Sequence, residues 1–349
     1  MKVMVMMSGG VDSSVAAALV RDAGHDVVGV TLKLWGGESD SGCCSVSDVD
    51  DARRAADALG VDHHVFDFSD SFTRHVVEPY VQDHQVGRTP NPCIECNRHL
   101  KFAAVDERAR SLGFDAVATG HHARIVLKED GTYRIARGAD PAKDQSYVLH
   151  MLDQEHLART LLPIGHMTKT EVRTLAQRFG MRTATKPDSQ DVCFITSKQG
   201  RESFLAQRTT LTPATVLDQS GKELGSVGSA QMVTIGQRRG LGLPGGTAPQ
   251  FVLDVDVEGQ RVVVGERRDL RADSQPFERL AWSSDQIAGE VLVQCSAHGI
   301  ARPAVIEMDP LRDGYGRIVW SEPQRRIAPG QSLVIYVGDE VAGGAMATR

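Results

Sequence analysis

The sequence predicts an α/β fold in which an N-terminal doubly wound parallel sheet precedes a small β-rich domain and a C-terminal β-barrel. Three observations carry this prediction. Apolar strand-like runs alternate with helical runs up to about residue 200. A turn rich in serine and glycine joins the first predicted strand to the first predicted helix. Beyond residue 201, short β-rich runs separated by glycine turns replace the alternation.

The predicted elements define three domains, at residues 1–200, 201–268 and 269–349. In the first domain we expect strands at 3–7, 27–34, 64–68 and 116–119, and helices at 13–23, 47–59, 98–112 and 169–179. The second domain should contain strands at 214–217, 231–235, 251–257 and 261–264, and the third at 290–295, 304–308, 317–320 and 332–337. The Gly-Gly-Ala run at 343–345 predicts a frayed end.

Composition points to a soluble, cytoplasmic enzyme. Of the 349 residues 41% are hydrophobic and 24% charged, and no apolar run approaches the roughly 20 residues that span a bilayer. The start of the sequence does not read as a secretion signal. Six cysteines are too few for a disulfide scaffold and fit reactive or metal-binding thiols better. The net charge of −6 argues mildly against nucleic acid, although arginines cluster locally at 238–239, 267–271 and 325–326.

Residues 8–14, Ser-Gly-Gly-Val-Asp-Ser-Ser, have the composition of a phosphate cradle. A glycine turn lets backbone N–H groups converge on an anion, and the helix that follows adds the positive end of its dipole. The common phosphate loop ends in Gly-Lys, but this one has no lysine. Asp12 stands there instead, where a carboxylate would help to hold Mg²⁺. The alternative is an ordinary strand-to-helix turn.

The cysteines form the second strong signal. Cys93 and Cys96 follow two prolines at Cys-x-x-Cys spacing, and Cys193 lies where polar residues lead into a predicted apolar strand. A helix from about residue 97 would place Cys96 near a helix N-terminus, which lowers the pKa of a thiol and exposes it as thiolate. Three interpretations stay open: buried structural cysteines, a structural zinc site that lacks a second Cys-x-x-Cys pair, and sulfur chemistry through a persulfide and a disulfide.

The loop at 8–14 resembles the pyrophosphate loop (PP-loop) of the ATP pyrophosphatases, and over nearly its whole length the chain resembles the tRNA-specific 2-thiouridylases. The resemblance rests on motifs in a fixed order, at 8–14, 89–97 with Lys101-Phe102, 118–121, 143–147, 188–195, 234–242 and 329–332. It implies ATP-dependent 2-thiolation of the wobble uridine in tRNA, by adenylation of the C2 oxygen and sulfur transfer from a cysteine persulfide. It also implies a sulfur-donor or sulfur-relay protein as partner, and no membrane.

The resemblance assigns roles to individual residues. Cys96 matches the nucleophile and Cys193 the persulfide carrier, while Asp12 assists catalysis with Mg²⁺. ATP would be held by Met6, Met7, Ser8, Gly9, Gly10, Val11, Asp12 and Ser13, with Leu32 and Gly120 at the adenosine. Transfer RNA would be contacted by Asn91, Pro92, Cys93, His121, Lys143, Asp144, Gln145 and Gln331, with the C-terminal barrel gripping the anticodon stem.

Two positions depart from the family pattern. Many members carry Asp, a proposed acid/base group, where this chain has Cys93. A second hypothesis therefore makes Cys93, Cys96 and Cys193 the ligands of an iron–sulfur cluster with one iron open for sulfur. Members also often carry a basic Arg-Tyr-Arg-like run where this chain reads Ser296-Ala297-His298, which weakens that expected contact with tRNA.

Two alternative functions would each explain only part of these observations. A PP-loop enzyme that adenylates a small-molecule acceptor would not need Cys96 and Cys193. A non-catalytic tRNA- or iron–sulfur-binding protein would not need the intact loop with Asp12.

Overall fold

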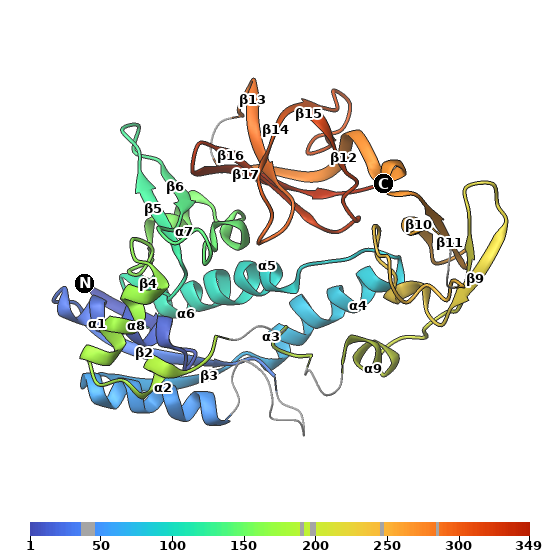
Figure 1. Cartoon of the computed structure of the whole chain (residues 1–349). Coiled ribbons are helices and arrows are strands. Elements are labelled where there is room, and N and C mark those ends of the chain that lie inside the picture. Colours follow the sequence, from blue (N-terminus) through green and yellow to red (C-terminus); the bar gives the residue numbers. More distant parts are fainter. Residues whose placement is uncertain (36–45, 189–191, 196–199, 245–247, 284–285) are drawn as a thin grey trace. The chain divides into compact units, whose positions relative to one another are not determined.

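The computed structural model describes residues 1–35, 46–188, 192–195, 200–244, 248–283 and 286–349. The chain forms two compact units (Figure 1). Unit 1 comprises Met1–Val77, Pro92–Lys198 and Asp339–Ala342, and unit 2 comprises Glu78–Asn91, Gln199–Gly338 and Gly343–Arg349. Among the described residues no helix is both long and apolar enough to cross a membrane.

Unit 1 is built on a five-stranded parallel sheet in the order β3-β2-β1-β4-β7. The strands are β1 Lys2–Met6, β2 Asp26–Lys33, β3 Asp62–Asp67, β4 Ala116–Ala118 and β7 Thr160–Leu161. The chain moves outward from β1 in one direction through β2 and β3, and then in the other through β4 and β7. This order confirms the doubly wound sheet. It puts the change of direction between β1 and β4, and ligands of such sheets bind beyond the carboxyl ends of the strands at that point.

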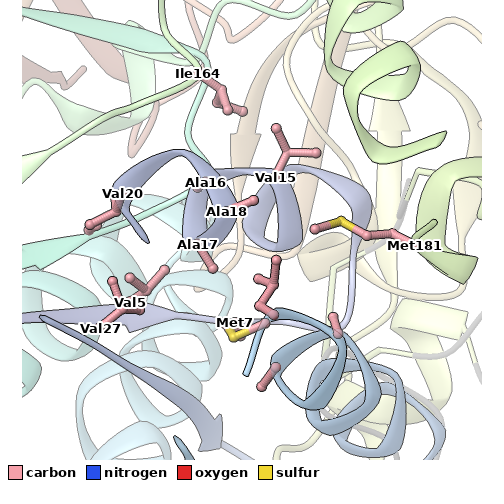
Figure 2. Packing of buried hydrophobic residues seen from close by; sticks show 14 of the residues in the cluster. Val5, Met7, Val15, Ala16, Ala17, Ala18, Val20, Val27, Ile164 and Met181 are labelled. Atoms are coloured by element: carbon pink, nitrogen blue, oxygen red, sulfur yellow. The ribbon is translucent and has the colours of Figure 1, made fainter. Parts of the chain in front are cut away.

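Helix α1 (Val11–Asp22) forms the centre of the core of unit 1 (Figure 2). Its run of small residues, Val15 to Ala18, is fully buried. Small side chains let the helix lie close to β1 and β2 on one side and to α2 (Val46–Leu59) and α8 (Lys169–Arg178) on others. Burial on several faces holds the start of α1, and with it the loop before it, in a fixed place.

The other helices of unit 1 are short. They are α3 Ser69–Phe72, α5 Pro92–Cys96, α6 Val105–Ser111 and α7 Gln154–Ala158, with π-helical segments at Thr73–Val77 and Asn97–Ala104 and 3₁₀ turns at Ser146–Leu149 and Arg182–Thr185. A hairpin that we did not predict, β5 Ala123–Leu127 and β6 Tyr133–Arg137, follows β4. Its strand β6 pairs at Ala136 with Glu340 near the end of the chain.

Unit 2 begins with α4 Glu78–Gln85 and α9 Gly200–Ala206 and contains a sheet in the order β10-β11-β8-β9. Its strands are β8 Ala214–Leu217, β9 Glu223–Val227, β10 Phe251–Asp256 and β11 Arg261–Gly265, and β9 was not predicted. The expected strand at 231–235 is wrong, since Ala230–Met232 forms a 3₁₀ turn. The buried side chain of Gln231 hydrogen-bonds Thr212 and Ser229 there, so this segment fixes the approach to β8 instead of pairing in the sheet.

A second sheet of unit 2 closes into a six-stranded barrel in the order β12-β15-β14-β13-β16-β17, with β12 paired to β17. Its strands are β12 Arg271–Trp282, β13 Glu290–Gln294, β14 Arg302–Met308, β15 Gly316–Arg325, β16 Ser332–Val337 and β17 Glu340–Ala347, and a 3₁₀ turn at Arg267–Leu270 precedes them. The first three residues of β17 belong to unit 1 and the rest to unit 2. The frayed end expected at 343–345 is wrong. Gly343 pairs with Trp282, and a Cβ at Gly343 would lie 2.6 Å from the Ala281 carbonyl oxygen, so glycine permits the closing contact.

Candidate nucleotide and thiol site

The loop at residues 8–10 lies at the carboxyl end of β1 and leads into the N-terminus of α1. Gly9 has φ of +70°, and a Cβ there would lie 2.2 Å from the Asp48 carbonyl oxygen, so the turn requires glycine. The Ser13 hydroxyl oxygen accepts from the Ser8 amide at 3.1 Å, and Ser14 Oγ donates to the Gly10 carbonyl at 2.9 Å. These bonds fix a turn of the kind that presents backbone N–H groups to an anion.

Gly120 lies against this loop at the carboxyl end of β4. A Cβ at Gly120 would lie 2.6 Å from the Ser13 amide nitrogen and 2.7 Å from the Asp12 carbonyl carbon. The structure therefore brings Gly120 and the loop together, as the topology of the sheet requires. Met6 and Met7 are buried at the end of β1, and Leu32 is buried near the end of β2.

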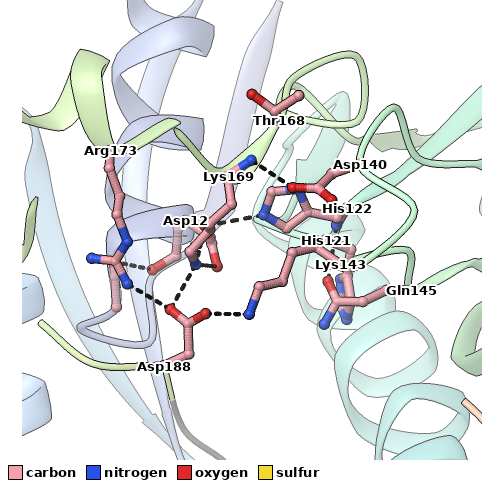
Figure 3. A network of polar contacts seen from close by, with 12 residues as sticks. Asp12, His121, His122, Asp140, Lys143, Gln145, Thr168, Lys169, Arg173 and Asp188 are labelled. Carbon is pink, nitrogen blue, oxygen red and sulfur yellow. Dashed lines mark hydrogen bonds and ion pairs between the residues drawn. The ribbon is translucent and has the colours of Figure 1, made fainter. Parts of the chain in front are cut away.

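Asp12 is paired with two basic side chains that the sequence analysis did not single out (Figure 3). Lys169 Nζ lies 2.9 and 2.7 Å from the two carboxylate oxygens, and His122 Nε2 lies 3.2 Å from Oδ1. Burial raises the pKa of Asp12, but hydrogen bonds from His122 and Lys169 outweigh it, and the pKa falls below its usual value. The carboxylate is therefore ionised at neutral pH, as a ligand for Mg²⁺ must be.

A second carboxylate, Asp188, collects three cations in the same network (Figure 3). Lys143 Nζ lies at 2.7 Å, Lys169 Nζ at 2.8 Å and an Arg173 guanidinium nitrogen at 2.9 Å. Burial raises the pKa of Asp188, but the hydrogen bonds from Lys143 and Lys169 outweigh it and lower the pKa to about 2. Lys169 thus bridges a carboxylate of the loop and a carboxylate at the start of the motif that carries Cys193. Residues 189–191 of that motif lie outside the described residues.

A second lysine, Lys186, contacts the backbone of the loop. Lys186 Nζ donates to the Gly9 carbonyl at 3.0 Å and to carboxylate oxygens of Asp48 and Asp51, both at 2.7 Å. Burial lowers the pKa of Lys186, but its hydrogen bonds with Asp48 and Asp51 raise it overall. Lys186 and Gly9 are 177 positions apart in the sequence, so no local motif predicts their contact.

The thiols differ from what the sequence predicts. The helical segment begins at Pro92 and not near residue 97, so Cys93 lies in its first turn and Cys96 lies one turn further on. Cys93 is exposed and Cys96 is only 7% exposed, which reverses the exposure expected for Cys96. Proline fits the first position of a helix, and this explains the early start.

Cys193 and Phe194 lie in a turn that continues into a bend at Ile195, so the strand start expected at these residues is wrong. Residues 196–199 lie outside the described residues. The Cys193 thiol is partly exposed. The next residue, Phe194, is buried, and its ring packs against Phe72 and Trp35 at centroid distances of 5.5 and 6.3 Å. The aromatic anchor holds the chain beside the thiol.

Within the described part of the chain, no three His, Cys, Asp or Glu side chains converge in a way that would hold a metal ion. Cys93, Cys96 and Cys193 all belong to that part. The iron–sulfur hypothesis therefore stays a hypothesis without geometric support. For Mg²⁺ the requirement is smaller, because the ion usually keeps several waters and takes one or two carboxylates besides substrate phosphates. Asp12 fits that requirement.

Several predicted tRNA contacts have internal partners. Lys143 pairs with Asp188, Asp144 accepts from Arg137 and from the Ser146 amide and hydroxyl, and Gln145 Oε1 accepts from the His122 amide. These residues support the network around Asp12 and Asp188. Their contact with tRNA stays a prediction.

His121 is likewise turned inward. It is 7% exposed, its Nδ1 lies 2.7 Å from Thr119 Oγ1, and its ring lies 5.8 Å from that of Phe102. Burial lowers the pKa of His121 well below its usual value, so the ring is neutral and offers no charge to a phosphate.

In unit 2, Gln331 hydrogen-bonds the segment that precedes α5, the helix with Cys93 and Cys96. Its side-chain amide donates to the Thr89 carbonyl, and the Thr89 amide donates to the Pro329 carbonyl at 2.7 Å. Arg88, the preceding residue, pairs with Glu278 of β12 at 3.1 Å. Asn91, which belongs to the same unit, is partly buried, and Pro92, the first residue of α5, is buried.

Three family models match the chain in order. They are described as the tRNA methyl transferase HUP domain, over residues 1–197, the tRNA methyl transferase PRC-barrel domain, over 202–266, and the aminomethyltransferase beta-barrel domain, over 275–347. Among solved structures, the U34-tRNA thiolase NcsA from Methanococcus maripaludis with its [4Fe-4S] cluster is 16% identical, with a TM-score of 0.36 over 59% of this chain and 63% of that one. A likeness this weak carries no argument about function.

Curated relatives are much more similar. A tRNA-specific 2-thiouridylase MnmA from Moorella thermoacetica is 44% identical over 98% of this chain and 98% of its own length. Another, from Roseiflexus sp., is 43% identical over 100% of this chain and 99% of its own length. Identity of this degree over full length, together with the loop and the thiols described above, shows that the chain belongs to the tRNA-specific 2-thiouridylase family.

Proposed function

We propose that this chain catalyses the ATP-dependent 2-thiolation of the wobble uridine of tRNA. The observation that carries the proposal is the presence in one compact unit of the glycine loop at the β1–β4 switch point and of Cys96 and Cys193. An adenylating enzyme needs the loop, and a sulfur-transfer enzyme needs two thiols. The near full-length similarity to 2-thiouridylases supports the same conclusion.

The loop would bind ATP through residues 6–13, with Leu32 and Gly120 at the adenosine. Mg²⁺ at Asp12 would neutralise charge on the phosphates when bound. The uracil C2 oxygen attacks the α-phosphate, pyrophosphate leaves, and C2 then carries AMP as a good leaving group. Backbone N–H groups of the loop stabilise the charge that develops on the departing pyrophosphate.

Sulfur would arrive as a persulfide on Cys193, loaded by a donor or relay protein. Its outer sulfur attacks C2, and AMP leaves with the electron pair of the C2–O bond. Cys96, as a thiolate, then attacks Sγ of Cys193. The sulfur–sulfur bond breaks, thiouridine keeps the transferred sulfur, and Cys96 and Cys193 are left as a disulfide for an external thiol to reduce.

The target base must leave its stack to react. Flipping costs a few kcal/mol, and less in an anticodon loop that is already single-stranded. We propose that Asn91, Pro92 and Cys93 meet the base, and that Lys143, Asp144, Gln145, His121 and Gln331 line the path of the tRNA. We also keep the domain limits 1–200, 201–268 and 269–349 and a cytoplasmic location as proposals. The spans of the three family models support the domain limits.

The test is mass spectrometry of nucleosides from unmodified tRNA incubated with the protein, ATP, Mg²⁺ and either a sulfide source or a persulfide donor. We expect ATP-dependent 2-thiouridine from the wild type, and none from Cys96→Ser or Cys193→Ser when the persulfide donor supplies the sulfur, with tRNA binding retained. Cys295→Ser is the matched control. Burial raises the pKa of Cys295 to about 12, so its thiol stays protonated, and the variant should keep full activity.

Two outcomes would redirect the proposal. If the wild type makes no 2-thiouridine under either aerobic or anaerobic conditions but exchanges pyrophosphate into ATP, it adenylates a different acceptor. If it does neither, it is a binding protein. Iron and labile-sulfide assays on anaerobically purified protein test the cluster at Cys93, Cys96 and Cys193 separately, and two negative results would remove that hypothesis.

A further inference from the structure

We propose that Lys169 is a phosphate-binding residue of the nucleotide site, which Asp12 and Asp188 hold in place for the pyrophosphate portion of ATP. The proposal depends on the proposed function in one respect, the binding of ATP by the loop at residues 8–14. Lys169 would supply from a distant part of the chain the cation that this loop lacks in its own sequence.

Lys169 is fixed at both ends. It is the first residue of α8, where Thr168 and Glu171 form a capping box, and its amide donates to an Asp140 carboxylate oxygen at 3.0 Å. Its side chain is only 12% exposed, and Nζ lies 2.7 Å from the nearer oxygen of Asp12 and 2.8 Å from Asp188 (Figure 3). A lysine buried to this extent loses most of its side-chain freedom on folding, so little remains to be lost when a ligand binds.

The charge on Asp12 explains why a lysine is needed there. A carboxylate in the loop repels a triphosphate, and the repulsion is strong because Asp12 is partly withdrawn from solvent. Lys169 neutralises that charge through its ion pair with Asp12. If the Asp12 carboxylate held Mg²⁺, the Lys169 ammonium group would be available to a phosphate oxygen, with Asp188 still holding it in place.

The other lysine and arginine side chains near Asp12 either have partners of their own or share only Asp188 with Lys169. Lys186 donates to the Gly9 carbonyl and to Asp48 and Asp51, so it braces the backbone of the loop. Lys143 and Arg173 are paired with Asp188. Of these lysine and arginine side chains, Lys169 is the one that pairs with Asp12, in the first turn of α1.

The experiment compares the dissociation constants of Mg-ATP, Mg-pyrophosphate and AMP for wild type and Lys169→Met. Loss of one charge-assisted contact should weaken ATP and pyrophosphate by roughly 10- to 100-fold and change AMP by less than about 2-fold. Lys169→Arg, which keeps the charge, should lose less affinity. Lys128→Met is the matched control, because it removes a lysine of the same unit whose partner is Glu340, and it should bind all three ligands as the wild type does.

Two results would overturn the proposal: wild-type affinity of Lys169→Met for pyrophosphate, or an equal loss of affinity for AMP. The second would mean that Lys169 acts through the fold of the site. If Lys169→Met does not fold, as judged by thermal unfolding, Lys169→Gln keeps a hydrogen-bond donor and carries the same expectation. None of these measurements needs tRNA or sulfur. The role of Lys169 could therefore be confirmed in a protein that makes no 2-thiouridine, and it could be contradicted in an active thiouridylase.

Discussion

Gly120 gives the most direct test of how the nucleotide loop is built. In Gly120→Ala the new Cβ would lie 2.6 Å from the Ser13 amide nitrogen and 2.7 Å from the Asp12 carbonyl carbon. Both are backbone atoms at the start of α1, which is packed on several sides. A comfortable contact needs about 3.4 Å, so the end of β4 and the loop must separate by about 0.8 Å.

A displacement of this size should affect both stability and catalysis. Overpacking costs about 1–3 kcal/mol of folding free energy, which for a unit of this size lowers the unfolding temperature by about 2–12 °C. Misplacing catalytic groups by about 1 Å can cost roughly 100-fold in rate, so pyrophosphate release should fall by about 10- to 100-fold. The substitution should affect ATP binding and pyrophosphate release more than the free energy of unfolding, because the displaced atoms belong to the nucleotide loop.

The assays are calorimetric titration with Mg-ATP, ATP–pyrophosphate exchange and thermal unfolding. Gly228→Ala is the matched control, since its Cβ would meet nothing within 4 Å and its φ is not positive. The close contact between Gly120 and the loop would be contradicted if Gly120→Ala bound ATP with an affinity within about 2-fold of the wild type and unfolded at the same temperature as Gly228→Ala.

Three further predictions concern pH and salt. Because the pKa of Asp188 is lowered to about 2 in the folded state, from a usual value of 3.8, its ion pairs stabilise the protein above pH 4. That stability should be lost as the pH falls from 4 to 2, and acid unfolding of Asp188→Asn should show less of this dependence. Burial lowers the pKa of His84 to about 4, so the unfolded chain takes up a proton below pH 6.5 that the folded chain does not. The free energy of unfolding should therefore drop by about 2 kcal/mol between pH 7 and 5. An equal drop in a His84→Gln variant over the same pH range would contradict this account. Finally, if phosphate contacts dominate tRNA affinity, the logarithm of the association constant should fall steeply and linearly with the logarithm of salt concentration, and a flat response in filter binding would exclude that picture.

Local sequence signals were sufficient wherever the determining contacts are local. Continuous apolar runs predict β1, β2 and β4, because a parallel strand that is buried on both faces needs apolar residues at nearly every position. The capping pattern of Thr168 with Glu171 accords with the helix expected from residue 169. Strands β9, β12 and β17 escaped prediction because exposed polar residues or glycines interrupt them. Their pairing partners supply the stabilisation that their own composition lacks.

The predictions for Cys93, Cys96 and Cys193 were wrong where the local structure differs from the apolar pattern or depends on distant contacts. Pro92 begins the helix five residues earlier than expected, which places Cys93 in the first turn and moves Cys96 one turn further into the helix. The chain at Cys193 is held by Phe194 against Phe72 and Trp35. Those aromatic contacts join segments more than a hundred residues apart, and no periodicity within one segment can report them.

The class of fold, the glycine loop with Asp12, the candidate thiols and the family to which they point all rest on residues that are neighbours in the chain, so they could be predicted from the sequence. The arrangement of charge around the loop could not, because it depends on contacts between distant segments. Lys169 and Asp12 are 157 positions apart, and Lys186 and Gly9 are 177 apart. Pairing of this kind depends on where the sheet brings the ends of its strands and the starts of its helices together. Ion pairs act through distance in space, so they become visible only once the chain is folded.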